Sequence, residues 1–223
     1  MNENLEKREL FSKNVKKIVP VSKIISEQIK TKFPESESRL SYPIPPGVNK
    51  INIKKHEYDK RRPVIGFMGK EWKRKGLPKV IEIWREIQKK IPLAKLCLAG
   101  FPTSEEVGLE SYEFENVKTL GYVTDKSIFY EQIDILLHPA KKEAYGMVIA
   151  EASSLGIPVL CSNKCGAAFD NLFNVQSLSD EEDTTKWIHQ VENLFSKVNN
   201  IPPSSTSWKR VAESYVQLYE KLN

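Results

Sequence analysis

Cysteine, histidine and long apolar runs are all scarce in this chain of 223 residues. The cysteines are Cys97, Cys161 and Cys165; their number is odd and no CxxC spacing occurs. The pattern indicates neither a disulfide framework nor a cysteine zinc site, so we expect reduced thiols. No apolar run approaches the roughly 20 residues that span a bilayer, and the start, MNENLEKREL, lacks the apolar core of a signal peptide. We therefore expect a cytoplasmic protein.

An excess of charge of one sign is also almost absent. The 34 basic and 29 acidic residues leave a net charge of +5. A surplus this small does not indicate nucleic acid as a partner, and it fits a phosphate-bearing small ligand or an anionic membrane surface equally well. With 40% hydrophobic and 28% charged residues, the composition is typical of a soluble globular protein rather than a disordered one.

A proline-rich stretch, SYPIPPGVNK, cannot lie inside a helix or a central strand and predicts a domain boundary near residues 43–50. Before it, residues 1–16 are polar and are expected to be helical or frayed. Residues 18–21 predict a short buried strand, and Ser22 is the expected N-cap of the helix that follows.

Short apolar strands alternate with helices from Val64 onward. This order predicts a Rossmann-like α/β fold, with a parallel sheet covered by helices on both faces. In such sheets, ligands bind beyond the carboxyl ends of the strands. Strands are expected in 64–69, 95–100, 117–123, 134–140 and 157–162, and helices in 76–90, 126–133, 146–156, 181–196 and 207–222.

A basic loop, GFMGKEWKRKG at residues 66–76, leads from a strand into a helix. Gly69 ends the strand, and four cations crowd the loop: Lys70, Lys73, Arg74 and Lys75. A helix N-terminus favours anions, and neighbouring cations can neutralise a diphosphate. The glycine spacing differs from that of the phosphate loop of nucleotide hydrolases, and no Ser or Thr follows the lysine. On composition alone, a solvated basic turn explains the segment equally well.

Two glutamates flank the start of the helix at 146–156. Glu143 lies in the loop after a strand, Gly146 lets the backbone approach a ligand, and Glu151 lies about a turn and a half into the helix. A ribose diol matches a carboxylate well because it offers two donors to two acceptor oxygens. Taken singly, each glutamate is more simply explained as a surface charge; together with the basic loop, the pair favours a nucleotide-sugar site.

Two weaker signals lie nearby. LGYVTD, at residues 120–125, ends a strand and opens a helix, so its backbone can read a base edge or serve as a plain connecting turn. His138 ends an apolar strand, where a lone histidine is usually structural, although its position beside the Glu143 loop is also consistent with a supporting role.

At these residues the chain resembles family 4 of the retaining glycosyltransferases, in the carboxyl-terminal domain of their GT-B fold. EAYGMVIAE, from Glu143 to Glu151, resembles the paired-glutamate motif, EASSLGIPVL its continuation, and FMGKEWKRKG the family's basic-loop element. PVSKIISEQIKTKF and PIPPGVN resemble the end of the amino-terminal domain and the interdomain linker, and WKRVAESYVQLYEKL the closing helix. LLHPAKKEAYG and CGAA resemble the lipopolysaccharide-core branch.

The resemblance implies three parts of the chain. Residues 1–45 would be a remnant of the amino-terminal acceptor domain with the linker, 46–205 the nucleotide-sugar-binding domain, and 206–223 a helix that crosses back toward the first domain. The family's glycine-rich acceptor loop and its amino-domain histidine have no match here. The resemblance therefore implies the donor-binding half of an enzyme, with the other half on a separate chain or missing from a fragment.

The resemblance also implies residue roles. Glu151 would bind the ribose hydroxyls and Glu143 the donor sugar, while Lys70, in place of the family's frequent arginine, and Lys75 would neutralise the diphosphate; Glu143, Lys70 and Lys75 form the catalytic set. The other expected donor-binding residues are Gly69, Val123, Tyr145, Gly146, Met147 and Val148, and His138 would support the site. Neither a metal nor a cofactor is implied, because the lysines take the metal's role and no Asp-x-Asp pair occurs. Residues 164–168 depart from the family's paired glycines and glutamate, so donor choice stays open.

The expected activity is transfer of a hexose from a nucleotide-diphosphate sugar to a glycan or lipid-linked acceptor, with retention, in cell-surface polysaccharide or lipopolysaccharide synthesis. The expected location is the cytoplasm, with peripheral contact at the inner membrane face. One alternative is a nucleotide-sugar-binding module without transfer activity. Another is a basic adaptor whose lysine clusters at 50–62 and 70–79 contact anionic lipid.

Overall fold

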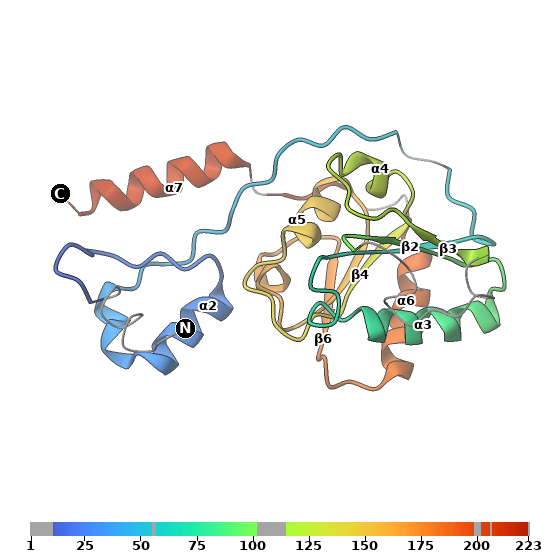
Figure 1. Cartoon of the computed structure of the whole chain (residues 1–223). Coiled ribbons are helices and arrows are strands. Elements are labelled where there is room, and N and C mark those ends of the chain that lie inside the picture. The colour runs from blue at the N-terminus through green and yellow to red at the C-terminus, as the bar shows by residue number, and fades with distance from the viewer. Residues whose placement is uncertain (1–10, 55–56, 102–114, 199–201, 206, 223) are drawn as a thin grey trace.

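A six-stranded, wholly parallel sheet forms the centre of the protein (Figure 1). The structure is a computed structural model that describes residues 11–54, 57–101, 115–198, 202–205 and 207–222. The strand order is β3-β2-β1-β4-β5-β6. The strands are β1 (Val64–Met68), β2 (Lys95–Ala99), β3 (Val117–Thr119), β4 (Ile135–His138), β5 (Val159–Ser162) and β6 (Val175–Leu178). The predicted α/β class and the parallel sheet are confirmed.

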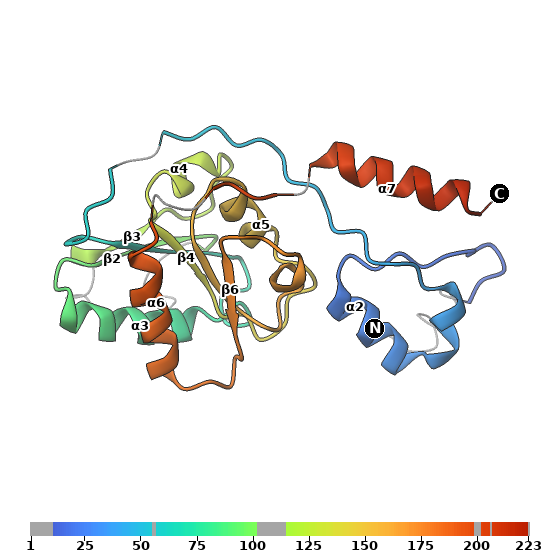
Figure 2. The ribbon, with the colours of Figure 1, turned by 180° about the vertical axis from the view of Figure 1, so that it is seen from behind.

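Helices cover both faces of this sheet, as Figures 1 and 2 show. On one face lie α3 (Leu77–Lys90) and α6 (Thr184–Phe195), and on the other α4 (Ser127–Tyr130) and α5 (Met147–Ser154). Each face has its own buried apolar cluster because side chains alternate between the faces along a strand. The reversal of strand order occurs between β1 and β4, where ligand sites of such sheets lie.

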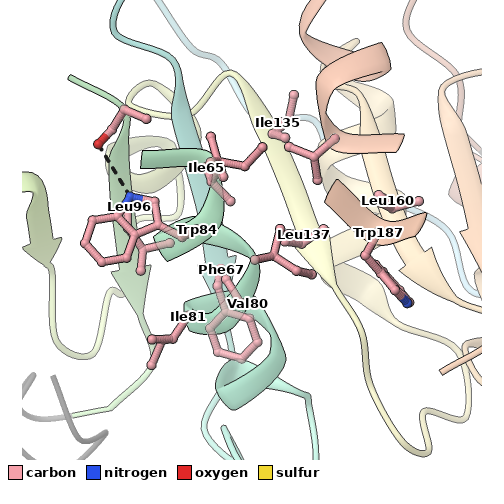
Figure 3. Close-up of a cluster of buried hydrophobic side chains, with 14 of the residues drawn as sticks. Ile65, Phe67, Val80, Ile81, Trp84, Leu96, Ile135, Leu137, Leu160 and Trp187 are labelled. Carbon is pink, nitrogen blue, oxygen red and sulfur yellow. Dashed lines mark hydrogen bonds between the residues drawn. The ribbon is translucent and has the colours of Figure 1, made fainter. Parts of the chain in front are cut away.

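The cluster between the sheet and the helices α3 and α6 contains more buried aromatic side chains than the cluster on the other face (Figure 3). Trp84 of α3 and Trp187 of α6 are fully buried there, in the same cluster as Ile65 and Phe67 of β1. The indole Nε1 of Trp84 donates to the carbonyl of Ala94 at 3.4 Å, so this buried donor has a partner. Burial of each such side chain stabilises the fold by about 1.5–3 kcal/mol, which holds β1 and the loop after it in a fixed position.

The amino-terminal segment and the last helix lie beside the sheet domain (Figures 1 and 2). They comprise α2 (Lys23–Lys32), the 3₁₀ helix η1 (Pro34–Arg39) and α7 (Trp208–Glu220), and they share a small cluster of Ile44, Val211 and Leu218. Ser22 caps α2 as expected, accepting from the backbone N–H of Ile25 at 3.3 Å. The division of the chain at residues 45 and 205 stays a prediction.

Two expectations differ from the structure. Residues 18–21 form no strand: Ile18 makes only an isolated bridge to Leu40, and Val21 is 38% exposed. Strand β6 was not predicted, because its sequence, VQSL, is polar and at most half-buried, as suits the edge of a sheet. Of the expected helix or frayed segment at 1–16, residues 1–10 lie outside the described residues, and 11–16 form turns.

No helix in the described ranges is long and apolar enough to cross a bilayer.

Candidate functional site

Three glycines lie at the carboxyl ends of neighbouring strands. Gly69 follows β1, Gly100 follows β2 and Gly121 lies just past β3. The N–H of Gly69 donates to Ala99 at 2.9 Å, and that of Gly100 to Gly121 at 2.7 Å. Gly100 has a φ of 99°, and a Cβ there would lie 2.8 Å from the Gly69 backbone. The chain therefore needs glycine at Gly100 for close backbone packing at this edge of the sheet.

Residues 69–76 of the basic loop, which follow β1, contact the loop that carries Glu143. Gly76, with a φ of 89°, precedes α3, and a Cβ on it would lie 2.1 Å from the carbonyl oxygen of Pro139. The N–H of Lys141 donates to the carbonyl of Arg74 at 2.9 Å. The side chain of Arg74 in turn donates to the carbonyl of Lys142. These contacts bring Arg74 and Lys75 beside the loop after β4.

Glu143 is held from two sides. Its Oε2 lies 3.4 Å from the Nζ of Lys75, and the two side chains are 15% and 20% exposed. Its backbone forms a parallel bridge to Cys165: its N–H donates to Lys164 at 3.1 Å, and its carbonyl accepts from Gly166 at 3.2 Å. A Cβ on Gly146 would come within 3.4 Å of the Glu143 Cγ. The carboxylate therefore lies beside the N-terminus of α5.

His138 lies beneath this carboxylate. It is fully buried at the end of β4 and stacks on Phe67 with a centroid separation of 6.1 Å. Burial lowers the pKa of His138, so the ring is neutral at pH 7. Its Nε2 lies 3.8 Å from Oε2 of Glu143, which is longer than a hydrogen bond. The histidine neighbours the site, as predicted, while its role stays a prediction.

The pKa of Glu143 is lowered from 4.5 to about 2 by the donor contact from His138 and by the charge of Lys75, which outweigh the opposing effect of burial. A neutral ring acting over 3.8 Å is a weak donor. We therefore assign most of the effect to the ammonium of Lys75 at 3.4 Å. The result is a Glu143 carboxylate that stays ionised throughout the physiological range, 3.4 Å from the Nζ of Lys75.

Glu151 lies in α5 and is 6% exposed. The Nζ of Lys126 lies 2.5 Å from its Oε1, and the hydroxyl of Tyr130 donates to its Oε2 at 2.8 Å. Beside the carboxylate is a pocket of about 480 Å³, whose lining includes Met147 and Trp208. Sequence reasoning missed Lys126 and Tyr130. The available signal was their spacing of four residues in KSIFY, which places both on one face of a helical turn.

The remaining predicted site residues differ in exposure and contacts. Lys70 is exposed, and its Nζ lies 5.7 Å from the centre of the Tyr122 ring, whereas Glu143 pairs with Lys75. Gly146 precedes α5 with a φ of 100°, as expected where a backbone must approach a ligand. Tyr145 and Val148 are buried, whereas Met147 and Val123 are half-buried.

No group of three or more His, Cys, Asp or Glu side chains with metal-binding geometry occurs within the part of the chain that the structure describes.

The comparisons with known proteins agree with this architecture. Over 155 residues, which are 66% of this chain and 40% of the relative, the chain is 31% identical to the capsular polysaccharide biosynthesis glycosyltransferase CapM of Staphylococcus aureus. Over 65 residues, which are 29% of this chain and 16% of the relative, it is 40% identical to the lipopolysaccharide glucosyltransferase WaaG of Escherichia coli K12. The chain thus spans less than half the length of either relative.

Solved structures are similar over most of the chain. The crystal structure of WaaG superposes with a TM-score of 0.69 at 18% identity, covering 86% of this chain and 57% of that one. A sucrose-phosphate synthase from Thermosynechococcus elongatus superposes with a TM-score of 0.73 at 18% identity, covering 99% and 61%. At this identity the likeness shows the fold, which is the GT-B architecture.

The family model for glycosyl transferases group 1 matches residues 48–172, more than half of the chain. The matched range holds the basic loop, Glu143 and Glu151. The chain therefore belongs to the glycosyl transferases group 1 family.

Proposed function

We propose that this chain is the donor-binding half of a retaining glycosyltransferase that moves a hexose from a nucleotide-diphosphate sugar to a glycan or lipid-linked acceptor. The observation that carries the proposal is the Lys75–Glu143 pair at the N-terminus of α5, with the buried carboxylate of Glu151 further along the same helix. Both elements lie within the family-matched range. Cations and helix N-terminal amides bind the phosphates of such a donor, and carboxylates accept hydrogen bonds from its hydroxyls.

In this proposal, the charge that develops on the leaving diphosphate is stabilised by Lys75 and Lys70 and by the free backbone N–H groups at the start of α5. Such preorganised donors act on the transition state without reorganisation, and one of them is typically worth about 3–4 kcal/mol. Glu143 contacts hydroxyls of the donor sugar, and Glu151 accepts from the ribose diol. We propose a metal-free site, because the lysines supply the charge that a divalent cation would otherwise provide.

Retention and hexose specificity are supported by the resemblance of EAYGMVIAE to the paired-glutamate motif of retaining family members. A role in capsule or lipopolysaccharide synthesis is supported by the names of CapM and WaaG. An acceptor-binding domain, in the same protein or on a separate chain, would complete the enzyme; the 40% coverage of CapM supports this view. Peripheral contact with an anionic membrane is part of the proposal.

Calorimetry with UDP-, GDP- and ADP-sugars tests donor binding. We expect one base to bind, and Lys75→Met to weaken that binding by about tenfold to a hundredfold, because loss of a charge-assisted contact costs about 1.5–3 kcal/mol. Lys89→Met is the matched control: it removes a lysine paired with Glu86 on the surface of α3 and should leave affinity unchanged. If no nucleotide sugar binds at millimolar concentration, the proposal fails.

A second candidate is a nucleotide-sugar-binding module without transfer activity, because the family-matched range 48–172 holds the expected donor-binding residues. Donor binding without sugar release, in the presence of candidate acceptors, supports the module. Formation of a product whose anomeric configuration matches that of the donor supports the transferase.

A further inference from the structure

Two side chains from one helical turn hold the carboxylate of Glu151. Lys126 directly precedes α4 and Tyr130 ends it, and the N–H of Tyr130 donates to the carbonyl of Lys126 at 3.1 Å. Their side chains therefore leave the turn on the same face. Lys126 contacts Oε1 at 2.5 Å and Tyr130 contacts Oε2 at 2.8 Å, so each oxygen receives one donor from the protein.

These two contacts use half of the hydrogen-bond acceptor sites of the Glu151 carboxylate. An ionised carboxylate offers about four acceptor sites, two on each oxygen. One site on each oxygen is taken by a donor from the protein. One site on each oxygen thus stays open, which is the number that a vicinal diol needs for its two O–H donors.

The carboxylate has a place to receive such a diol. Glu151 and Lys126 both line the pocket of about 480 Å³, together with Met147 and residues of the linker such as Asn49. Pockets for small ligands have volumes of about 300–1,000 Å³, so this one has the size expected for a small ligand such as a nucleoside. The Lys126 side chain is 40% exposed, so its ammonium contacts both the carboxylate and solvent and does not seal the pocket.

We propose that Lys126 and Tyr130 are positioning residues, which fix the Glu151 carboxylate so that its two open acceptor sites meet the ribose diol of a nucleoside diphosphate. This inference rests on the proposed function. Glu151 is 6% exposed, and a buried carboxylate with fewer donors would be poorly solvated and free to change rotamer. Burial, together with the nearby Glu151 charge, raises the pKa of Tyr130 well above its usual value, so the phenol remains a donor.

The test compares ribonucleotides with 2′,3′-dideoxyribonucleotides. Calorimetry gives the dissociation constants of UDP, GDP and ADP and of their dideoxy counterparts for the wild type, Lys126→Met and Tyr130→Phe. We expect the wild type to prefer the ribonucleotide of the base that it binds. Each substitution should reduce that preference about fivefold, as expected for loss of roughly 1 kcal/mol per hydrogen bond, while affinity for the dideoxynucleotide stays within about twofold.

Three variants control this experiment. Lys90→Met removes an ion pair of similar length, 2.6 Å to Glu192, from the opposite face of the sheet and should change nothing. Tyr219→Phe removes an exposed phenol from α7 and should also change nothing. Lys126→Arg keeps a cationic donor and should restore at least part of the preference.

The possible outcomes separate the inference from the proposed function. A ribose preference that survives both substitutions overturns the inference alone. Equal losses for ribo- and dideoxynucleotides assign the two residues a merely structural role and overturn it as well. A stronger preference of Lys126→Met for the ribonucleotide would mean that the lysine competes with the ribose for the Glu151 carboxylate, and it would overturn the inference for Lys126. Failure of every nucleotide to bind the wild type overturns the proposed function and, with it, this inference.

Discussion

The Lys75–Glu143 pair predicts how the free energy of unfolding depends on pH. In Glu143→Gln the carboxylate is replaced by a neutral amide of nearly the same shape. The pKa of Glu143 is lowered from 4.5 to about 2 in the folded protein. Because the folded-state pKa is depressed, the stabilising effect is fully present above the unfolded pKa and is lost as the pH falls toward 2.

The magnitude follows from the pKa difference. A difference of about 2.5 units, at 1.36 kcal/mol per unit, sets an upper bound of about 3 kcal/mol on the contribution to the free energy of unfolding at pH 7. It is an upper bound because the His138 contact included in the shift, at 3.8 Å, is longer than a hydrogen bond. Glu143 and Lys75 are 15% and 20% exposed, so solvent screening removes only part of this. Linkage then predicts that about 1 kcal/mol of the effect is lost between pH 7 and pH 3.5, and the remainder at lower pH.

Urea unfolding at constant ionic strength, at both pH values, measures this effect. The free-energy difference between wild type and Glu143→Gln should shrink by about 1 kcal/mol at pH 3.5, because the other carboxylates cancel in the subtraction. Lys75→Met should couple to Glu143→Gln in a double-mutant cycle. Glu86→Gln removes an exposed partner of Lys89 and should change stability by less than about 0.5 kcal/mol at either pH. A wild-type–variant difference that is the same at pH 7 and pH 3.5 would refute the electrostatic reasoning.

Three further predictions concern backbone, core and site. Gly76→Ala should lower the free energy of unfolding, measured by thermal melts, by about 2 kcal/mol or more, since φ is 89° and a Cβ would meet the Pro139 carbonyl. The control Gly121→Ala has open space around the added Cβ and should lower it by less. Trp187→Ala should lower the free energy of unfolding by about 3–5 kcal/mol in urea titrations, because the indole is fully buried. Glu151→Ala should weaken nucleotide binding by about 1–3 kcal/mol in calorimetry; unchanged affinity would remove Glu151 from the site.

The sequence predicted most of the fold because its periodicity is strong where burial is complete. The strand Val64–Met68 and the helix Leu77–Lys90 follow directly from apolar runs and helical spacing. Strand β6 has no such signal, because at the sheet edge only part of each side chain is buried. The strand expected at 18–21 did not form although its residues are apolar: among the described residues, this segment makes one bridge, from Ile18 to Leu40, and joins none of the six strands of the sheet.

By itself, the sequence determined the fold class and the paired-glutamate segment, because periodicity, glycine positions and short motifs are local properties of the chain. Only the tertiary structure decided which charges meet. It brings Lys75 rather than Lys70 to Glu143, and it brings Lys126 and Tyr130 to Glu151 from 25 and 21 residues away. Ion pairs depend on distances of a few ångströms between side chains, and these distances are fixed by how strands and loops pack rather than by spacing along the sequence.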